Sequence, residues 1–428
     1  MTFTIDSLTN TGLENGWIES ASCFPAGGPR FLEPNYIQEA ASWTELPGEA
    51  VADCLEAANI ILHDVGLQKL SWHVHRRLFV VISEPTKAQN WPSAIPGLHN
   101  LSGAFYLLQA LSGITSMLAN HKQRGIPTEV SRLNCRDIHI WAREYKTLGE
   151  PRQHGFAHEF DPPRWGLHIR GLSWIGRSLR GVILRIGRLQ FIHAPYSFPY
   201  LAFRHVQSGK VQVLSEKGNR FTDDGWKAKK EDEEAWQSDY TELDGKVTAT
   251  PITADGRAHK TPTRLDLKEW KPVLLPGDPV LEIHIPEDGP MDFDACGESL
   301  VEMIRGFPTY FAGESFSAFV CESWLLDPQF QDRMRETSNI CRFQRECYLY
   351  PIGPGSGRSG LLRLFTSDDI PSLPRDTNMR QAYLNLFDSG GLWRGGGMML
   401  FPNDLDWGRQ VYLQAHRRES REQRAENR

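Results

Sequence analysis

The spacing of apolar residues changes its period at about residue 165, and this change restricts the possible folds more than any other feature of the sequence. Before it, residues 49–65 and 98–121 place apolar side chains three and four positions apart, which predicts amphipathic helices. After it, residues 179–193 alternate on both sides of Gly187, which predicts a β-hairpin. The sequence therefore predicts a helical N-terminal domain followed by a domain that contains a sheet.

The C-terminal half of the chain alternates between predicted strands and helices. We expect, in this order, a strand over Val280–Ile285, a helix over Asp292–Gly306, a strand over Phe316–Trp324, a helix over Pro328–Arg335, a strand over Phe343–Pro351, a strand over Leu361–Phe365 and a helix over Asn378–Phe387. The β-α-β-α-β order is typical of an α/β layer. The chain as a whole is expected to belong to the α+β or α/β class.

Shifts in composition divide the 428 residues into five segments. Turn-forming residues indicate an extended arm over residues 1–48, and the helical domain is expected to occupy residues 49–150. The sheet domain is expected to occupy residues 165–415, with a polar, β-rich insertion at about 204–278. Residues 416–428 contain five Arg and three Glu with almost no apolar side chain, which predicts a polar tail.

Charge and cysteine content exclude several classes of protein. The net charge of −6 gives no overall attraction to nucleic acid. The seven cysteines contain no Cys-x-x-Cys pair, which argues against a disulfide framework and for a reducing compartment. The longest apolar stretch, Gly103–Leu118, is too short to span a bilayer, and the N-terminus lacks the pattern of a signal peptide. We therefore expect a cytoplasmic protein that binds neither nucleic acid nor a membrane; its oligomeric state stays open.

Several segments resemble two-part acyltransferases that have a helical N-acyltransferase N-terminal domain and a GNAT-like C-terminal domain. These segments are residues 121–141, RGVILRIGRLQF (180–191), GDPVLEIHIP (277–286), SWLLDP (323–328), FQRE (343–346) and PRDT (374–377). Each segment alone is a weak signal, but their order and spacing together are specific. The resemblance covers roughly residues 50–415.

The resemblance implies a fold and a reaction. A GNAT-like domain contains a mixed sheet that splays open between its fourth and fifth strands, where an acyl-CoA lies. Here those strands would be Val280–Ile285 and Phe316–Trp324. The implied reaction moves an acyl group from acyl-CoA, or a related thioester, to an amine of a small molecule, with the helical domain shaping the acceptor pocket.

The loop after the expected fourth strand departs from the family pattern. GNAT enzymes usually bind the CoA diphosphate with a glycine-rich loop and the N–H groups of a helix N-terminus. Here the loop contains two prolines, which donate no hydrogen bond, and three carboxylates, Glu287, Asp288 and Asp292. Asp292 is also a plausible N-cap. Either CoA binds differently, for which Ile285, Gly289 and Met291 are the candidate contacts, or another ligand is used.

The expected fourth strand carries the first candidate for catalysis. Glu282 and His284 are two positions apart and share one face, while Leu281 and Ile283 face the other way. If this polar face lines the cleft, His284 would take the proton of the attacking amine, and Glu282 would orient His284 or hold the nucleophile. The alternative is a histidine that is hydrogen-bonded in a core or loop. Ser323, near the end of the fifth strand, is the third candidate catalytic residue.

Four further side chains are candidates for substrate binding. Cys321 and Trp324 belong to the end of the expected fifth strand, although Cys321 also fits the role of a small core residue. Arg185 and Gln190 lie on the predicted hairpin, where they would bind a carboxylate or phosphate or simply face solvent.

The sequence predicts no metal site, because neither His73-x-His75 nor His154-x-x-x-His158 has a third ligand nearby. Two alternatives to acyl transfer remain open at this stage. One is a hydrolase, lyase or cyclase of the same fold that acts on a small metabolite without CoA. The other is a binding protein without catalysis.

Overall fold

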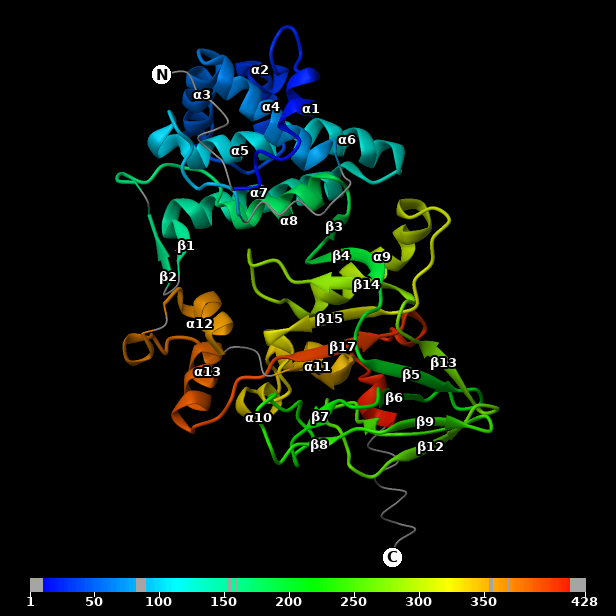
Figure 1. Cartoon of the computed structure of the whole chain (residues 1–428). Coiled ribbons are helices and arrows are strands. Elements are labelled where there is room, and N and C mark those ends of the chain that lie inside the picture. The colour runs from blue at the N-terminus through cyan, green and yellow to red at the C-terminus, as the bar shows by residue number, and fades with distance from the viewer. Residues whose placement is uncertain are drawn as a thin grey trace, which may run out of the picture. The chain divides into compact units, whose positions relative to one another are not determined.

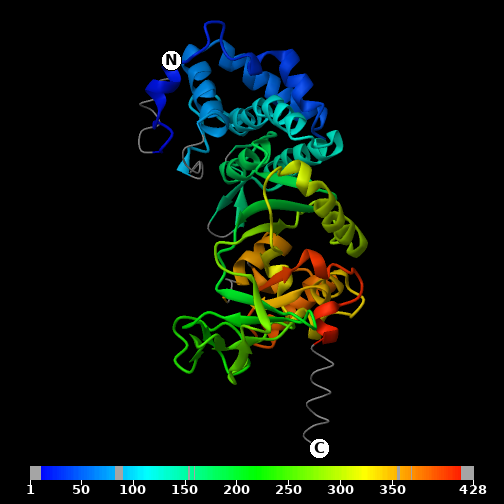
Figure 2. The ribbon, with the colours of Figure 1, turned by 90° about the vertical axis from the view of Figure 1, so that its right-hand side faces the viewer.

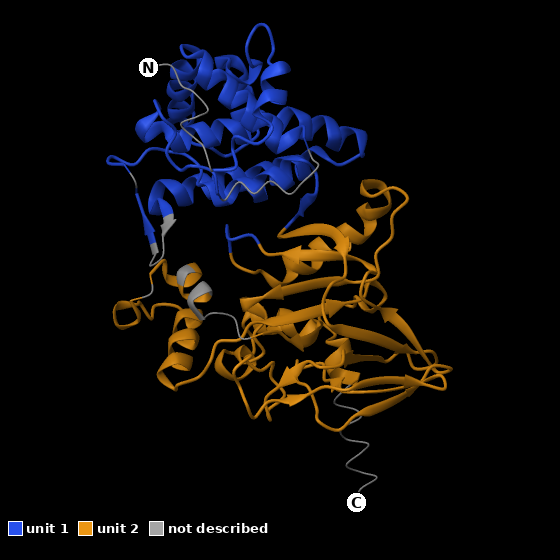
Figure 3. Ribbon diagram, in the orientation of Figure 1, with its two compact units in different colours: residues 1–187, 286–289 blue, residues 188–285, 290–428 orange. Residues whose placement is uncertain are grey.

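The computed structural model describes residues 11–81, 90–152, 155–158, 160–353, 357–367 and 369–415. It divides into two compact units (Figure 3): unit 1 is residues 1–187 and 286–289, and unit 2 is residues 188–285 and 290–428. The predicted polar tail, residues 416–428, lies outside the described residues.

Unit 1 is built mainly from helices (Figure 1). They are α1 (Trp17–Ser22), η2 (Arg30–Leu32), α2 (Pro34–Ala41), α3 (Gly48–Leu62), α4 (Val65–Phe79), η4 (His99–Leu101), α5 (Ser102–Ser112), α6 (Ile114–Gln123), α7 (Thr128–Leu148) and α8 (Ile169–Leu179), with strands β1 (Glu150–Arg152), β2 (Gly155–Ala157) and β3 (Ile183–Ile186). Every residue of α5 is buried, because α3, α4, α7 and α8 pack around it. The helical N-terminal region predicted from the apolar period is therefore present.

The N-terminal segment differs from the expected extended arm. Its described part, residues 11–48, contains α1, η2 and α2, and Leu32 and Ile37 are fully buried in the core of unit 1. Pro34 occupies the first turn of α2, where its fixed φ favours a helix start. The turn formers that suggest an arm only connect α1 to η2.

One helical run, His99–Gln123, has the length and apolar composition of a membrane-spanning helix. Of its most apolar window, 83% is buried inside the protein. The core helix of a folded domain has these same properties, so the run is weak evidence for a membrane span.

Five consecutive strands of a mixed sheet belong to unit 2, in the order β16-β17-β15-β14-β4. Strands β17, β15, β14 and β4 are labelled in Figure 1, and Figure 2 shows the same ribbon turned by 90°. The strands are β4 (Leu189–Pro195), β14 (Pro279–His284), β15 (Phe319–Ser323), β16 (Tyr348–Pro351) and β17 (Gly396–Leu400). Strands β14 and β15 are parallel, and the other neighbouring pairs are antiparallel. Helix α9 (Phe293–Tyr310) connects β14 to β15 and packs against β4. The predicted fourth and fifth strands are thus adjacent in the sheet.

The helices that follow β15 correct two predictions. They are α10 (Phe330–Arg333), α11 (Asn339–Glu346), α12 (Gly357–Phe365) and α13 (Asn378–Asp388), with η5 (Trp324–Leu326), η6 (Ile370–Ser372) and η7 (Pro402–Asp404). The expected strand Phe343–Pro351 begins only at Tyr348, because its first residues end α11. The expected strand Leu361–Phe365 is part of α12. Short apolar runs fit either structure, and here Leu361 and Phe365 are buried at helical spacing.

The polar insertion folds as small sheets. Strands β5 (Tyr200–His205), β6 (Val211–Ser215), β11 (Pro251–Ile252) and β13 (Trp270–Leu274) form one, in the order β11-β6-β5-β13; β9 (Tyr240–Leu243), β10 (Lys246–Ala249) and β12 (Thr263–Asp266) form a second; β7 (Arg220–Phe221) and β8 (Trp236–Gln237) pair separately. Tyr200 of β5 contacts Tyr350 of β16, with ring centroids 4.7 Å apart, so the insertion packs on the central sheet.

Candidate active site

Strands β14 and β15 part soon after they begin. Only Leu281 with Phe319 and Glu282 with Val320 are paired between them. By contrast, β14 stays paired with β4 as far as His284, and β15 stays paired with β17 as far as Ser323. The two strands therefore diverge beyond Val320, as the resemblance implies for the fourth and fifth strands.

The register decides which side chains share a face of the sheet. Since Glu282 pairs with Val320, the next residue of β15 on the face of Glu282 is Glu322. His284 pairs with Gln190 of β4, which places these two on the same face as well. Glu282 and His284 are half-buried, and Gln190 is buried. The structure thus brings Glu282, His284 and Gln190 together and adds Glu322.

Cys321 and Ser323 lie on the opposite face, so the expected grouping of Ser323 with His284 is not formed. Aromatic contacts place α9 on that face: its Phe307 contacts His193 of β4. Ser323 accepts a hydrogen bond from the Leu325 N–H at the start of η5. Cys321 is buried, which raises the pKa of its thiol to about 12, so it remains a thiol near neutral pH.

The carboxyl of Glu322 has a raised pKa. Its side chain is exposed, yet surrounding protein displaces enough water to raise the pKa of its carboxyl to about 7. Two charges act in opposite directions: Lys227 lowers this pKa and Glu282 raises it. A carboxyl with a pKa near the working pH is suited to accept a proton and release it again.

An aromatic wall adjoins this carboxyl. Burial raises the pKa of Tyr196, Tyr200 and Tyr350, and each also interacts electrostatically with Glu322. The Lys227 ammonium lies 5.8 Å from the centre of the Tyr200 ring, and burial lowers its pKa. The site therefore combines one carboxyl of raised pKa, one ammonium and three phenols.

In the loop after β14, the carboxylate of Asp288 does not lie free in the loop but is paired with arginines. The Asp288 carboxylate is buried and lies 2.7 Å from Arg185 Nη2 and 3.3 Å from Arg136 Nε, so its charge is compensated within unit 1. Asp292 is the N-cap of α9 as predicted, since its side chain accepts from the Ala295 N–H at 2.9 Å.

The three candidate cofactor contacts of this loop differ in exposure. Ile285 is half-buried, Gly289 is exposed and Met291 is buried. The exposed Gly289 is the most accessible of the three.

Arg185 and Trp324, two of the candidates for substrate binding, are instead packed inside the protein. Arg185 is buried in unit 1, where it lies between Asp288 and Asp137. Its charge is therefore committed to an internal ion cluster. Trp324 begins η5 after β15 has ended and packs against the apolar cluster around Phe330.

The first histidine pair, His73 and His75, is explained by packing. His73 is buried between Ser20 Oγ, at 2.8 Å from its Nδ1, and the Leu13 carbonyl oxygen, at 2.6 Å from its Nε2. His75 stacks on Phe31 with ring centroids 4.9 Å apart. His154 lies outside the described residues. Within the ranges that the structure describes, no three His, Cys, Asp or Glu side chains are grouped so as to hold a metal ion.

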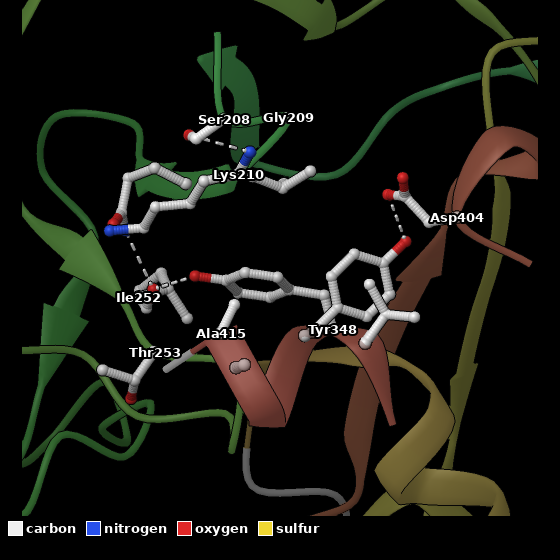
Figure 4. Close-up of a pocket in the computed structure, with 13 residues that line it drawn as sticks. Ser208, Gly209, Lys210, Ile252, Thr253, Tyr348, Asp404 and Ala415 are labelled. Carbon is white, nitrogen blue, oxygen red and sulfur yellow. Dashed lines mark hydrogen bonds between the residues drawn. The ribbon is translucent and has the colours of Figure 1, made fainter. Parts of the chain in front are cut away.

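A cavity of about 320 Å³ lies beside β16 (Figure 4). Lys210, Ile252, Tyr348, Asp404 and Ala415 are among its lining residues. The Tyr348 hydroxyl donates a hydrogen bond to the Ile252 carbonyl oxygen at 2.6 Å, so it is bonded to another residue that lines the cavity. None of the residues expected from the sequence to form the site lines this cavity.

Sequence reasoning did not single out Glu322 as a candidate residue. The strand pattern places Glu322 on one face together with Val320 and Trp324. This pattern fits a face that is exposed to solvent as well as one that lines a cleft. A carboxylate two residues beyond an apolar strand residue is the signal available in the sequence. Only the register with β14 shows that this face is the one that carries Glu282.

Comparison of the chain with known structures gives the same fold. An acyltransferase variant in complex with octanoyl-CoA has a TM-score of 0.59 and 18% identity, covering 93% of this chain and 98% of its own. An acyltransferase in complex with decanoyl-CoA and teicoplanin has a TM-score of 0.58 and 18% identity, covering 90% and 93%. No curated protein sequence matches the chain.

Family models match the chain in two consecutive parts. Residues 35–151 match the N-acyltransferase N-terminal domain, and residues 183–400 match the GNAT-like C-terminal domain. The second match alone covers half of the chain. This protein therefore belongs to the family with a GNAT-like C-terminal domain, preceded here by an N-acyltransferase N-terminal domain.

Proposed function

We propose that this protein transfers an acyl group from acyl-CoA to an amine of a small molecule. The observation that carries the proposal is the parting of β14 and β15 beside Glu322, whose carboxyl has a pKa of about 7. Family membership supports acyl transfer. The acyltransferases of similar fold that bind octanoyl-CoA or decanoyl-CoA support a medium-length acyl group. One of them also binds teicoplanin, which supports a small-molecule acceptor.

Glu322 is the proposed general base. In the reaction the amine nitrogen forms a bond to the thioester carbonyl carbon, the carbon–sulfur bond breaks, and the sulfur leaves with the CoA. The amine loses one proton, which the Glu322 carboxylate accepts. Glu282 favours this transfer, because its negative charge raises the proton affinity of Glu322. His284 shares the face of Glu282 and remains the second candidate for the proton transfer.

We place the reaction in the cytoplasm. All seven cysteines are free thiols, six of them buried, which suits a reducing compartment.

Two measurements test the acyl-transfer proposal. Octanoyl-CoA and decanoyl-CoA are expected to raise the melting temperature of the protein by mass action. With a panel of amine acceptors, the protein is expected to release free thiol and to form an acylated product, detected by mass spectrometry. Failure of every acyl-CoA in both measurements would overturn the proposal.

Glu322→Gln tests the choice of base. The amide cannot accept a proton, so kcat/KM is expected to fall by about 100-fold or more, the usual contribution of a general base. His284→Gln is the matched comparison. If His284→Gln loses activity and Glu322→Gln keeps it, the base is His284 and the assignment of Glu322 is wrong.

A further inference from the structure

Two phenols beside Glu322 are buried without a hydrogen-bond partner. Among the described residues, the Tyr196 and Tyr350 hydroxyls have none. Tyr350 is 0% and Tyr196 is 2% exposed, so solvent does not supply one. A buried hydroxyl that stays unpaired is costly, and such groups therefore call for a partner in some state of the protein.

The sheet directs Tyr350 toward Glu322. Gly397 of β17 lies between them: it pairs with Glu322 on one side and with Tyr350 on the other, so all three share a face. A Cβ at Gly397 would lie 1.9 Å from Tyr350 Cε2 and 2.3 Å from its Cζ. The ring thus covers Gly397, and the carbon that bears the hydroxyl lies over the strand next to Glu322.

The distance across this glycine suits a direct contact. Two strand spacings separate the Glu322 and Tyr350 backbones, about 10 Å. The Tyr350 ring already spans one spacing, and the Glu322 side chain is exposed. Rotation of the Glu322 side chain would bring its carboxylate to the unpaired hydroxyl.

We infer that Tyr350 is a positioning residue for Glu322, its phenol O–H donating a hydrogen bond to the Glu322 carboxylate in the state that accepts the substrate proton. The inference rests on the proposed role of Glu322 as base. Other groups that act on Glu322 are the ammonium of Lys227, the carboxyl of Glu282, the phenols of Tyr196 and Tyr200, and the thiol of Cys321, while His284 shares its face and Glu216 acts on Lys227.

Tyr350→Phe tests the inference without relying on activity. The variant keeps the ring over Gly397 and against Tyr200, and it removes only the donor. A donated hydrogen bond favours the ionised carboxyl, so its loss is expected to raise the pKa of Glu322 by about one pH unit. The readout is a pH titration of 13C-labelled glutamate carboxyls by NMR, with the Glu322 signal identified by its absence in Glu322→Gln.

Tyr348→Phe is the matched control. Tyr348 lies on the same strand and the same face, but its hydroxyl donates to the Ile252 carbonyl oxygen (Figure 4). This variant is expected to leave the Glu322 titration unchanged. An equal shift in both variants, or no shift in Tyr350→Phe, would overturn the inference. A shift in Tyr196→Phe but not in Tyr350→Phe would assign the role to the other phenol and overturn it as well.

Kinetics separate this inference from the proposed function. If wild-type protein transfers acyl groups, the acid limb of its kcat/KM profile is expected to move to higher pH in Tyr350→Phe by the amount that NMR shows. If wild-type protein is inactive but the NMR shift appears, the proposed function fails and the contact stands. If the NMR shift is absent in an active enzyme, the contact fails and the proposed function stands.

Discussion

The protonation of the Glu322 carboxyl depends on burial and on two opposing charges, those of Lys227 and Glu282. At the scale of single residues, this is the property on which the proposed chemistry depends. An exposed carboxyl in water ionises far below neutral pH and makes a weak base. Partial loss of water raises the pKa of Glu322 to about 7, where the protonated and ionised forms are both accessible.

Lys227 and Glu282 are therefore expected to shift the pH profile in opposite directions. Lys227→Met removes a positive charge that lowers the pKa of Glu322, so the acid limb of kcat/KM should move to higher pH. Glu282→Gln removes a negative charge that raises the pKa of Glu322, so the acid limb of kcat/KM should move to lower pH. Steady-state kinetics between pH 5 and 9 measure both. Shifts of the same sign would contradict this electrostatic picture.

At the scale of elements, the close packing of β16 on β17 requires a glycine at position 397. Gly397→Ala would place a Cβ 1.9 Å from the Tyr350 ring, which is fully buried and has no room to move. We expect a loss of about 1–3 kcal/mol in the free energy of unfolding, measured by urea denaturation. Gly48→Ala at the start of α3 is the control, because no atom lies within 4 Å of its new Cβ. A loss as large in the control would refute the packing argument.

The loop after β14 is stabilised by an internal ion cluster. Asp288 and Arg185 are buried and only 2.7 Å apart. Asp288→Ala would leave the Arg185 charge with only Asp137, at 3.7 Å, as a partner. We expect a loss of about 3 kcal/mol in the free energy of unfolding, as for other broken buried pairs. Glu45→Gln removes an exposed partner of Arg136 and is expected to cost less than about 1 kcal/mol. Equal costs would show that burial of the Asp288 pair adds nothing.

At the scale of the whole molecule, three buried histidines make the stability of unit 1 depend on pH. Three histidines of unit 1, His73, His75 and His121, have their pKa lowered from 6.5 to about 4 by burial. In the unfolded chain they bind protons below about pH 6.5, while the folded chain leaves them neutral until about pH 4. The contribution of these three histidines to the stability of unit 1 is therefore complete above pH 6.5, and it is lost as the pH falls toward 4.

Urea denaturation at pH 7.5 and pH 5 measures this loss. Lowering the pKa from 6.5 to about 4 corresponds to about 3 kcal/mol for each histidine across the full window. His121→Gln removes one titrating group, and a glutamine can still contact Ser131, which lies 2.9 Å from His121 Nδ1. Its loss of stability between the two pH values is expected to be smaller than that of the wild type. A loss of the same size would rule out a role for His121.

Much of the fold follows from local pattern. The helical N-terminal half, strands β14 and β15 and the cap of α9 at Asp292 depend on residues that are close in sequence, and each is present. Leu361–Phe365 was predicted wrongly as a strand, because a short apolar run fits helix and strand equally. Of the candidate catalytic residues, Glu282 and His284 share a face, as strand periodicity requires, and Ser323 lies on the other side of the sheet; their catalytic roles stay predictions.

The sequence by itself determined the helical N-terminal region, the family, and the placement of Glu282 and His284 on one face of a strand. Only the tertiary structure decided that Glu322 lies on the same face of the sheet as Glu282, that the Tyr350 ring covers Gly397, and that Asp288 is paired with Arg185. The physical reason is that alternation is a property of one strand, whereas register joins strands that are distant in sequence. A shift of register by one residue would exchange Glu322 for Cys321 on the face of Glu282.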